Sequence, residues 1–192
     1  MKPDLSKRVY VDPKGFFKIT PPEGWRITEY PTDPRGKVAL TSADLRAEIR
    51  SLAQWTGAGD LEALLDGLRQ VERSLGVRIP MQRISFCGIP AVKRTVTLIR
   101  MGISLRFLWI DFLQGRIAHN IQYSALSEDF ETYLPAALQS IGTYTPCQPA
   151  EPPSQETLAR HTAAAWRRGA SLAAEKERLR TLGKRAGSKI KA

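Results

Sequence analysis

The 192-residue chain contains only two cysteines, and no apolar run approaches the roughly 18 residues that a membrane-spanning helix needs. Cys87 and Cys147 lie far apart and match neither a metal-ligand spacing nor a Cys-x-x-Cys motif. A disulfide between them stays open, although two separate thiols are the favoured interpretation. These absences argue against a cysteine-ligated zinc site and against a transmembrane helix.

A secretory leader is also missing from the sequence. The first residues, Met1-Lys2-Pro3-Asp4, are polar and are not followed by the apolar segment of a signal peptide. We therefore expect a soluble, cytoplasmic protein. A periplasmic or envelope location is the alternative, which applies if a native leader preceded Met1.

Residue patterns that indicate catalysis are scarce as well. His119 lies in an expected strand and His161 in the C-terminal segment, so the two histidines are not expected to meet. No Ser-His-Asp arrangement, GxSxG turn, HExxH helix or glycine-rich phosphate loop is present. His119 shares an apolar strand face with Ile117 and Ile121, which favours a core histidine over a catalytic base. The sequence thus predicts a non-enzymatic protein without a metal or cofactor.

One carboxylate occupies an unexpected place. Asp111 lies inside the most apolar stretch of the chain, where an unpaired charge costs free energy. Arg94, Arg100 and Arg116 are its candidate partners. We interpret Asp111 as one half of a structural salt bridge rather than as an acid or base.

Positive charge is what the sequence has in excess. The chain holds 29 Lys and Arg against 19 Asp and Glu, a formal net charge of +10. Residues 149–192 contain 10 basic and 4 acidic residues, a net charge of +6, so this short segment carries more than half of the excess. Such a segment is compatible with an acidic protein, an anionic membrane surface or a nucleic acid, and equally with a solvated end of the chain.

The apolar pattern predicts an α+β fold with an antiparallel sheet of about six to eight strands and helices packed on its faces. The clearest strands are three consecutive ones, 91–99, 103–113 and 116–124, separated by tight turns. The middle strand is apolar on both alternating sets, which predicts cover on both of its faces. Shorter strands are expected at 9–11, 15–20, 25–30, 37–41, 47–54 and 81–86.

Two helices are expected to cover this sheet. Leucines recur at helical spacing over residues 60–75, with Asp60 or the glycine before it as the N-cap. A second apolar face lies between residues 128 and 141, with Ser127 as its expected N-cap. Pro135 lies inside this second span, so the helix either kinks or restarts there.

The proline content divides the chain into a domain at residues 1–145, a linker at 146–153 and a basic helical tail at 154–192. Heptad spacing in the tail is weak, because apolar residues fill only one of the two positions that a coiled coil needs. The candidate partner-binding residues are one aromatic and seven basic side chains of the tail: Arg160, Trp166, Arg167, Arg168, Arg178, Arg180, Lys184 and Arg185.

The order of these elements resembles the PsbP/Mog/DcrB-like group of proteins. The resemblance begins with Gly15-Phe16-Phe17-Lys18-Ile19 and Pro22-Glu23-Gly24-Trp25, which are similar to the group's opening Phe-x-Ile-x-x-Pro-x-Gly-Trp. It continues through the helix at 60–75, the turn Phe86-Cys87-Gly88-Ile89-Pro90-Ala91 and the closing helix at 128–141. It covers roughly residues 10–145, and the tail has no counterpart in the group.

The resemblance implies an α/β/α sandwich around an antiparallel sheet, and a function other than catalysis. Members of the group include photosystem extrinsic and assembly proteins, a Ran-binding import factor, bacterial envelope lipoproteins and chaperones for secreted effectors. Many bacterial members begin with a lipoprotein leader that this sequence lacks, and the metal-binding histidines of some plant members have no matching motif here. The resemblance therefore implies binding without naming the ligand.

We accordingly predict a non-catalytic binding, assembly or chaperone-like protein whose partner is another protein, with the basic tail helping to recruit it. Binding of a nucleic acid or an anionic membrane surface through the tail is the alternative. The aromatic side chains of the domain do not favour nucleic acid, since Phe107, Trp109 and Phe112 are expected to pack inside the sheet layers. No small-molecule substrate is inferred.

Overall fold

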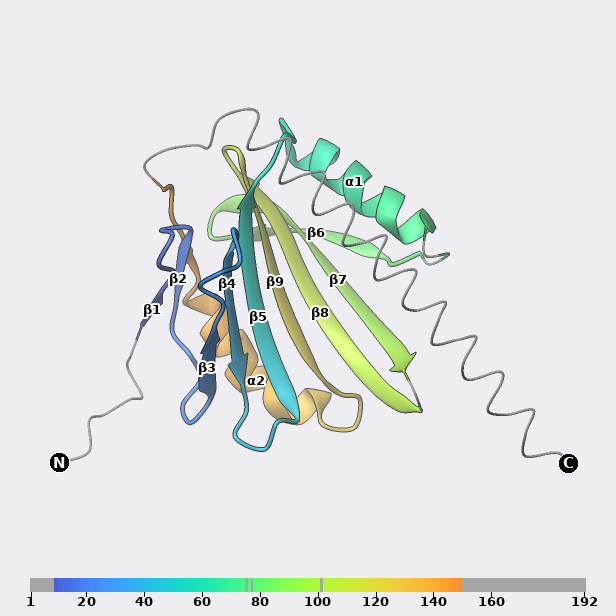
Figure 1. Ribbon diagram of the computed structural model, residues 1–192. Coiled ribbons are helices and arrows are strands. Elements are labelled where there is room, and N and C mark those ends of the chain that lie inside the picture. The colour runs from blue at the N-terminus through green and yellow to red at the C-terminus, as the bar shows by residue number, and fades with distance from the viewer. Residues whose placement is uncertain (1–8, 75, 77, 101, 150–192) are drawn as a thin grey trace, which may run out of the picture. The chain divides into compact units, whose positions relative to one another are not determined.

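The computed structural model describes residues 9–74, 76, 78–100 and 102–149. Seven strands form the main sheet: β3 (Arg26–Glu29), β4 (Gly36–Thr41), β5 (Ala47–Trp55), β6 (Met81–Phe86), β7 (Ile89–Arg100), β8 (Ile103–Gln114) and β9 (Ile117–Leu126). All neighbouring pairs are antiparallel, in the order β3-β4-β5-β9-β8-β7-β6 (Figure 1). The predicted antiparallel sheet is confirmed, and the three long consecutive strands lie side by side in it.

A second, three-stranded sheet was not expected from the sequence. It consists of β1 (Tyr10–Val11), β2 (Phe17–Ile19) and β10 (Thr145–Pro146), with β2 in the middle. Strand β10 lies in the proline-rich stretch that reads as the beginning of a linker. Proline is tolerated there because β10 is an edge strand. The backbone N–H of Cys147 also donates to the Phe16 carbonyl at 2.8 Å, so the chain is held to β2 through residue 147.

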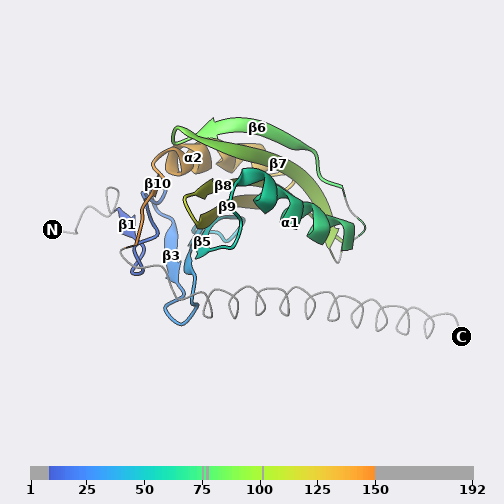
Figure 2. The same cartoon turned by 90° about the horizontal axis from the view of Figure 1, so that it is seen from above.

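The two helices lie on opposite faces of the main sheet, as Figure 2 shows from above. Helix α2 (Phe130–Gly142) covers one face, which we call the α2 side, and helix α1 (Leu61–Ser74) lies over the other, the α1 side. This is the layered arrangement that the sequence predicts. The remaining residues of the expected linker, 150–153, and the expected tail, 154–192, lie outside the described residues.

The hydrophobic core lies on the α2 side. Along β9, Ile117, His119, Ile121, Tyr123 and Ala125 are buried in strict alternation with half-buried residues that face the α1 side. Their cross-strand neighbours on β8 and β5 are buried as well, including Leu108, Ile110, Phe112, Ile49 and Ala53. Burying one large apolar side chain contributes about 1.5–3 kcal/mol, so this continuous layer dominates the stability of the fold.

Helix α1 begins and ends where its sequence predicts. The Asp60 carboxylate accepts the Ala63 N–H at 2.8 Å, which satisfies a donor at the helix start. Gly76, with φ 65°, follows the helix in the left-handed conformation that glycine adopts without steric cost. Leu65 is buried, whereas Val71 is 42% exposed, so the apolar face contacts the sheet mainly through its first two turns.

Helix α2 begins later than expected, and the predicted Ser127 cap is wrong. Asp129 occupies the N-cap position without a side-chain hydrogen bond to the helix. Ser127 instead bonds the Ser104 hydroxyl at 2.7 Å. The acidic side chains before the helix, Glu128 and Asp129, pair with Arg46. The helix continues through Pro135, so it does not restart there.

Candidate functional site

All eight residues that the sequence predicts as partner-binding residues lie in the tail, outside the described residues. Their role stays a prediction. Within the described part of the chain, the candidate sites are the titratable residues of the domain and the sheet surface that α1 and α2 leave exposed.

His119 is a core residue, as its strand pattern predicts. Its side chain is 1% exposed and lies flat against the Phe112 ring, with the ring centroids 4.6 Å apart. Its Nδ1 shares a hydrogen bond of 2.8 Å with the Tyr144 hydroxyl. Burial lowers the pKa of His119 to about 4, so the imidazole is neutral at pH 7. These contacts account for the residue as part of the packing.

Asp111 lies on the opposite face of the sheet from His119. Asp111 is paired with Asn120 across β8 and β9, and the next pair along is Phe112 with His119, so the two titratable groups alternate to different sides. The sheet therefore separates the groups that an acid–base site would have to join. A combined site of Asp111 and His119 is absent from the described structure.

The Asp111 carboxylate belongs to a buried ionic cluster under α1. Arg94 donates to it at 3.0 and 2.7 Å, and Asn120 donates at 2.7 Å. Arg94 also donates to Glu72 of α1 at 2.9 Å, and all three charged residues are less than 8% exposed. Burial raises the pKa of Asp111, although the charge of Arg94 opposes this rise. The predicted structural salt bridge is confirmed, with Arg94 as its cation.

Glu72 is the member of this cluster that sequence reasoning missed. It sits on the last turn of α1 among exposed positions, where a carboxylate normally faces solvent. The clue was geometric: Glu72 lies seven residues after Leu65, on the same side of the helix. Since Arg94 bridges two carboxylates from different elements, the cluster fastens α1 to the sheet face. Without Arg94, the carboxylates of Glu72 and Asp111 would be buried charges with no counter-charge.

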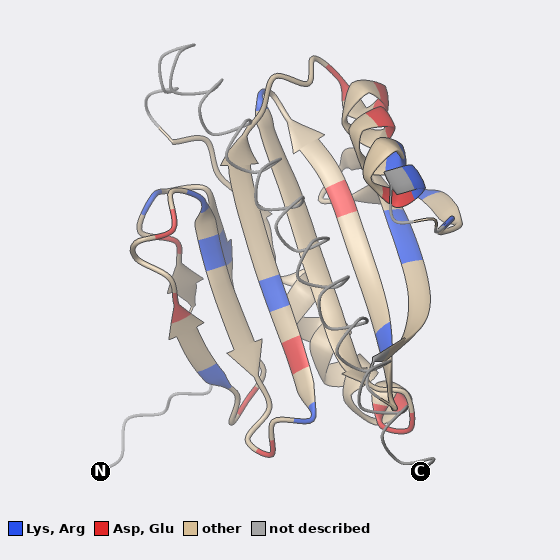
Figure 3. Cartoon of the chain, turned by 45° about the vertical axis from the view of Figure 1, so that its right-hand side comes forward, with Lys and Arg blue, Asp and Glu red and all other residues tan. Residues whose placement is uncertain are grey.

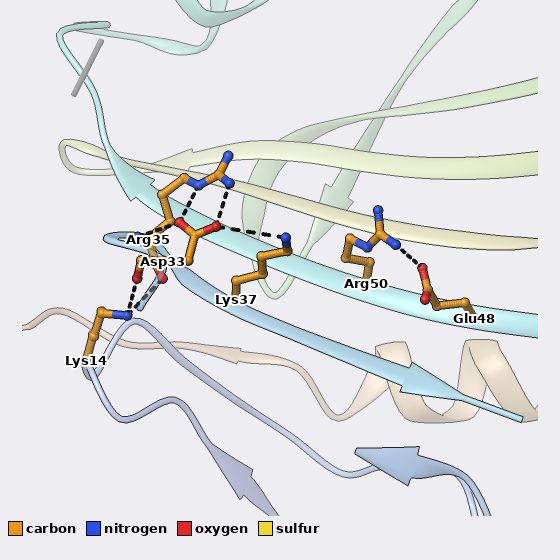
Figure 4. A network of polar contacts seen from close by, with 6 residues as sticks. All are labelled: Lys14, Asp33, Arg35, Lys37, Glu48 and Arg50. Carbon is orange, nitrogen blue, oxygen red and sulfur yellow. Dashed lines mark hydrogen bonds and ion pairs between the residues drawn. The ribbon is translucent and has the colours of Figure 1, made fainter. Parts of the chain in front are cut away.

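A second polar network lies at the far end of the same sheet, where β4 begins (Figure 4). Lys14 donates to the backbone carbonyls of Asp33 and Arg35, and the Asp33 carboxylate accepts two hydrogen bonds from Arg35 at 2.8 and 2.6 Å. These bonds hold the pKa of Asp33 down to about 2. Each cation of the network has an oxygen acceptor within it, including Arg50, which pairs with Glu48 at 2.6 Å. The network thus fastens the loop before β2 to β4.

The most prominent uncovered feature is apolar. Val96 and Leu98 of β7 lie beside Phe107 and Trp109 of β8 on the α1 side, and we call these four residues the apolar strip. The Phe107 and Trp109 rings stack with their centroids 5.4 Å apart. Both aromatic residues are half-buried, and Leu98 is 41% exposed. The expectation that packing fully covers the middle strand on both faces is therefore wrong at this end of the sheet.

The apolar strip continues toward the turn between β7 and β8. Ile103, at the start of β8 and on the same face as Phe107 and Trp109, is 52% exposed. Ile99 is 79% exposed but alternates with Leu98, so it lies on the α2 side of the sheet. The Arg94 guanidinium lies 5.0 Å from the centre of the Trp109 ring, so the buried ionic cluster borders the strip directly. Exposed apolar side chains that are contiguous, rather than scattered, mark surfaces that bind other macromolecules.

The described residues were also compared with what a disulfide, a metal site and a membrane-spanning helix require, and they form none of these. Both cysteines are free: Cys87 lies at an exposed turn and donates to the Tyr144 carbonyl at 3.0 Å, and Cys147 is half-buried. Within the described ranges, no group of three or more His, Cys, Asp or Glu side chains is arranged to hold a metal ion. Neither α1 nor α2 has the length and apolar character that crossing a membrane requires.

Neither protein-family models nor curated proteins contain a match to this sequence. Solved structures do match. The solution structure of cyanobacterial PsbP (CyanoP) from Synechocystis sp. PCC 6803 aligns with a TM-score of 0.56 and 10% identity, over 76% of this chain and 96% of that one. LpqN, involved in cell envelope biogenesis of Mycobacterium tuberculosis, aligns with a TM-score of 0.53 and 14% identity, over 73% of this chain and 90% of that one.

A crystal structure from Bacteroides thetaiotaomicron VPI-5482 aligns with a TM-score of 0.55 and 15% identity, over 76% of this chain. This chain spans only 50% of the length of that protein. Identities this low establish the fold and leave function open. The domain has the PsbP-like fold that the resemblance implies.

Proposed function

We propose that this protein is a non-catalytic binding protein, of the assembly or chaperone kind, that receives a segment of another protein on the α1 side of its main sheet. The domain offers a rigid scaffold, and the apolar strip is the surface that contacts the partner. The basic segment 154–192 helps to recruit that partner through its positive charge.

The observation that supports this proposal is the unequal cover of the two sheet faces. On the α2 side, Phe112 is completely buried, whereas three positions away on the α1 side Trp109 remains half-buried. Aromatic residues, phenylalanine included, are enriched at protein interfaces, and tryptophan is among the residues whose removal costs the most binding energy. Leaving such rings in water has no benefit for folding, which supports a role in binding.

Site-specific photo-crosslinking in the full chain tests the proposal. A photoreactive residue replaces Leu98, which is 41% exposed in the apolar strip, or Leu138, which is 45% exposed on α2. We expect a discrete protein adduct from position 98 and little from position 138. Equal adducts from both positions, or none from position 98, would contradict the proposal.

The contribution of the rings is tested separately. Trp109→Ala should lower the yield of the position-98 adduct at least fivefold, whereas Trp25→Ala, the matched control at a half-buried tryptophan beside Tyr133, should leave it unchanged. Removing residues 149–192 should leave the thermal unfolding of the domain intact and reduce recruitment. If that truncated protein unfolds, the tail has a structural role instead.

Binding of an anionic polymer or membrane surface through the tail is the second candidate, and the concentration of charge supports it. Residues 149–192 carry +6 of the net charge of +10. This candidate predicts a steep fall in affinity for nucleic acid or for vesicles containing anionic lipid as salt is added, because counterion release drives such binding. A flat salt response removes it.

A further inference from the structure

Strand β7 has an open edge. It runs for 12 residues, but its outer neighbour β6 pairs only with Ile89 to Arg94. The remaining residues, Thr95 to Arg100, pair with β8 on one side and with no described strand on the other. Figure 1 shows β6 diverging from β7 at this point, so that the lower half of β7 forms the border of the sheet.

The backbone groups of this edge face outward in a regular pattern. The two-residue turn at Cys87-Gly88, with φ 53° and 75°, has the geometry of a tight hairpin that closes on a hydrogen-bonded pair. Ile89, Ala91 and Lys93 therefore bond to β6, and the same side of the strand continues as Thr95, Thr97 and Ile99. These three residues direct their N–H and C=O groups away from β8.

The sequence of this edge carries none of the features that normally prevent pairing with another strand. Thr95-Val96-Thr97-Leu98-Ile99 contains no charge, no proline and no glycine, and every residue in it except leucine is β-branched. The opposite edge of the sheet differs. Strand β3 has only four residues, and two of them, Arg26 and Glu29, are charged. The β7 edge is thus the one suited to accept a strand.

We propose that the free β7 edge binds an extended segment of a partner protein as an eighth strand of the main sheet. Apolar residues at alternate positions of that strand would lie beside Val96 and Leu98 and enlarge the apolar strip. Acidic residues at the end of that strand near α1 fit the surroundings. Arg73 at the end of α1 and Arg78 before β6 are exposed and have no ion pair within the described structure, and Figure 3 shows Lys and Arg positions at that end of α1.

A second copy of the chain is the less suitable occupant. Two copies would each carry a net charge of +10, and like net charges oppose association. The eighth-strand proposal rests on the proposed protein-binding function, since it names how the partner is held. Strand addition of this kind takes its affinity from main-chain hydrogen bonds and its specificity from alternate side chains.

A peptide probe tests this inference on the full chain. The probe has alternating valine and threonine over five central residues and two glutamates at each end. Its control has proline at two successive central positions, which removes an N–H from each edge of the peptide. We expect saturable binding of the probe with a Kd below about 1 mM, no binding of the control, and at least tenfold slower amide exchange at Thr95, Thr97 and Ile99.

Variants of the two sheet edges locate the binding. Thr97→Pro removes an outward N–H without breaking a β7–β8 hydrogen bond, and Thr97→Lys adds a charge to the edge if the proline variant fails to fold. Either should weaken binding of the probe at least tenfold. Thr28→Lys, the same change on an exposed threonine of β3, should leave the affinity unchanged.

Every outcome decides the inference. Absence of binding up to about 1 mM, or slower exchange only at other amides, overturns it. Exchange at Thr95, Thr97 and Ile99 that slows with protein concentration in the absence of peptide overturns it in favour of a second copy. If the probe peptide does not bind but crosslinking from position 98 still captures a partner protein, the proposed protein-binding function is retained. Only binding by strand addition is then rejected.

Discussion

The two faces of the main sheet differ in how completely other elements cover them. On the α2 side, β9 and β8 contribute a continuous buried layer, and α2 and the small sheet complete it with rings such as Tyr144, which stacks on Phe17 at 5.2 Å. On the α1 side, α1 is the one helix of the described residues that covers the sheet; it covers only part of it and is fastened by the buried ionic cluster of Glu72, Arg94 and Asp111. The difference teaches that one strand can serve both stability and binding, because its alternate residues belong to different surfaces.

The largest expected effect comes from removing an aromatic ring on the closed face. Phe112→Ala should destabilise the protein by about 4 kcal/mol, because the ring is fully buried and leaves a cavity. Trp109→Ala, three residues away on the α1 side, should cost about 1–2 kcal/mol, since its ring is only half-buried. Urea unfolding of both variants gives the two values. Equal losses would mean that the two faces are closed to the same degree.

The next largest loss of stability is expected from replacing Arg94, the buried cation that joins α1 to the sheet. Arg94→Met should cost about 3 kcal/mol, because Glu72 and Asp111 would then be buried without a counter-charge. Adding Glu72→Gln and Asp111→Asn to the same chain should recover most of this loss, since the unpaired charges are gone. Both variants can be compared by urea unfolding at pH 7. A single variant as stable as the parent would show that the cluster does not fasten α1.

The closed face should also respond to pH through His119. Its folded pKa of about 4 lies below the ordinary value of 6.5, so the unfolded chain binds more protons between these values. The stabilising contribution is complete above pH 6.5 and is lost as the pH falls toward 4. This residue alone should lower the unfolding free energy by about 2 kcal/mol between pH 7 and pH 5.

The control for this pH response is His119→Gln, which cannot gain a charge. The variant should be less stable than the parent at pH 7 and should lose less stability on acidification. A parallel pH profile for parent and variant would mean that the imidazole is not responsible. Carboxylates such as Asp111, whose pKa burial raises, contribute to both profiles and cancel in the comparison.

The smallest effect is expected at the exposed ion pair that also joins α1 to the sheet. Arg83 of β6 pairs with Glu62, but their side chains are 66% and 52% exposed. Arg83→Ala should therefore change the unfolding free energy by no more than about 0.5 kcal/mol. A loss comparable to that of Arg94→Met would show that the edge of α1, rather than the buried cluster, fixes the helix. Thermal unfolding at low and high salt measures the difference.

Much of the main sheet could be predicted from the sequence, because its signals are local. Alternation along residues 117–126 and the turn at Cys87-Gly88 depend on neighbouring residues, and so do the leucines of α1. Strand β10 could not be found this way. Its two residues gain their conformation from pairing with β2, near the start of the domain, and Pro146 with the prolines that follow resembles a linker.

The candidate site was harder to predict than the fold. The apolar residues of β8 indicate burial, but composition does not reveal that α1 leaves Phe107 and Trp109 only half-buried. The open edge of β7 depends on a difference in length between two paired strands, and the register of β6 is needed to see it. The burial of Glu72 could not be predicted from the sequence either, because it depends on the contact between α1 and Arg94.

The small sheet has a consequence for how this protein is made. Strand β2 leaves the ribosome early, but its partner β10 is translated near the end of the domain, and the bonds beside them join residues 123 and 120 positions apart. Until β10 arrives, Phe17 and Ile19 lack part of their cover in the nascent chain. At roughly 5–20 residues per second, translation of the about 125 residues between β2 and β10 takes on the order of ten seconds. The small sheet, and with it the α2 side, can therefore be completed only after nearly the whole domain has been translated.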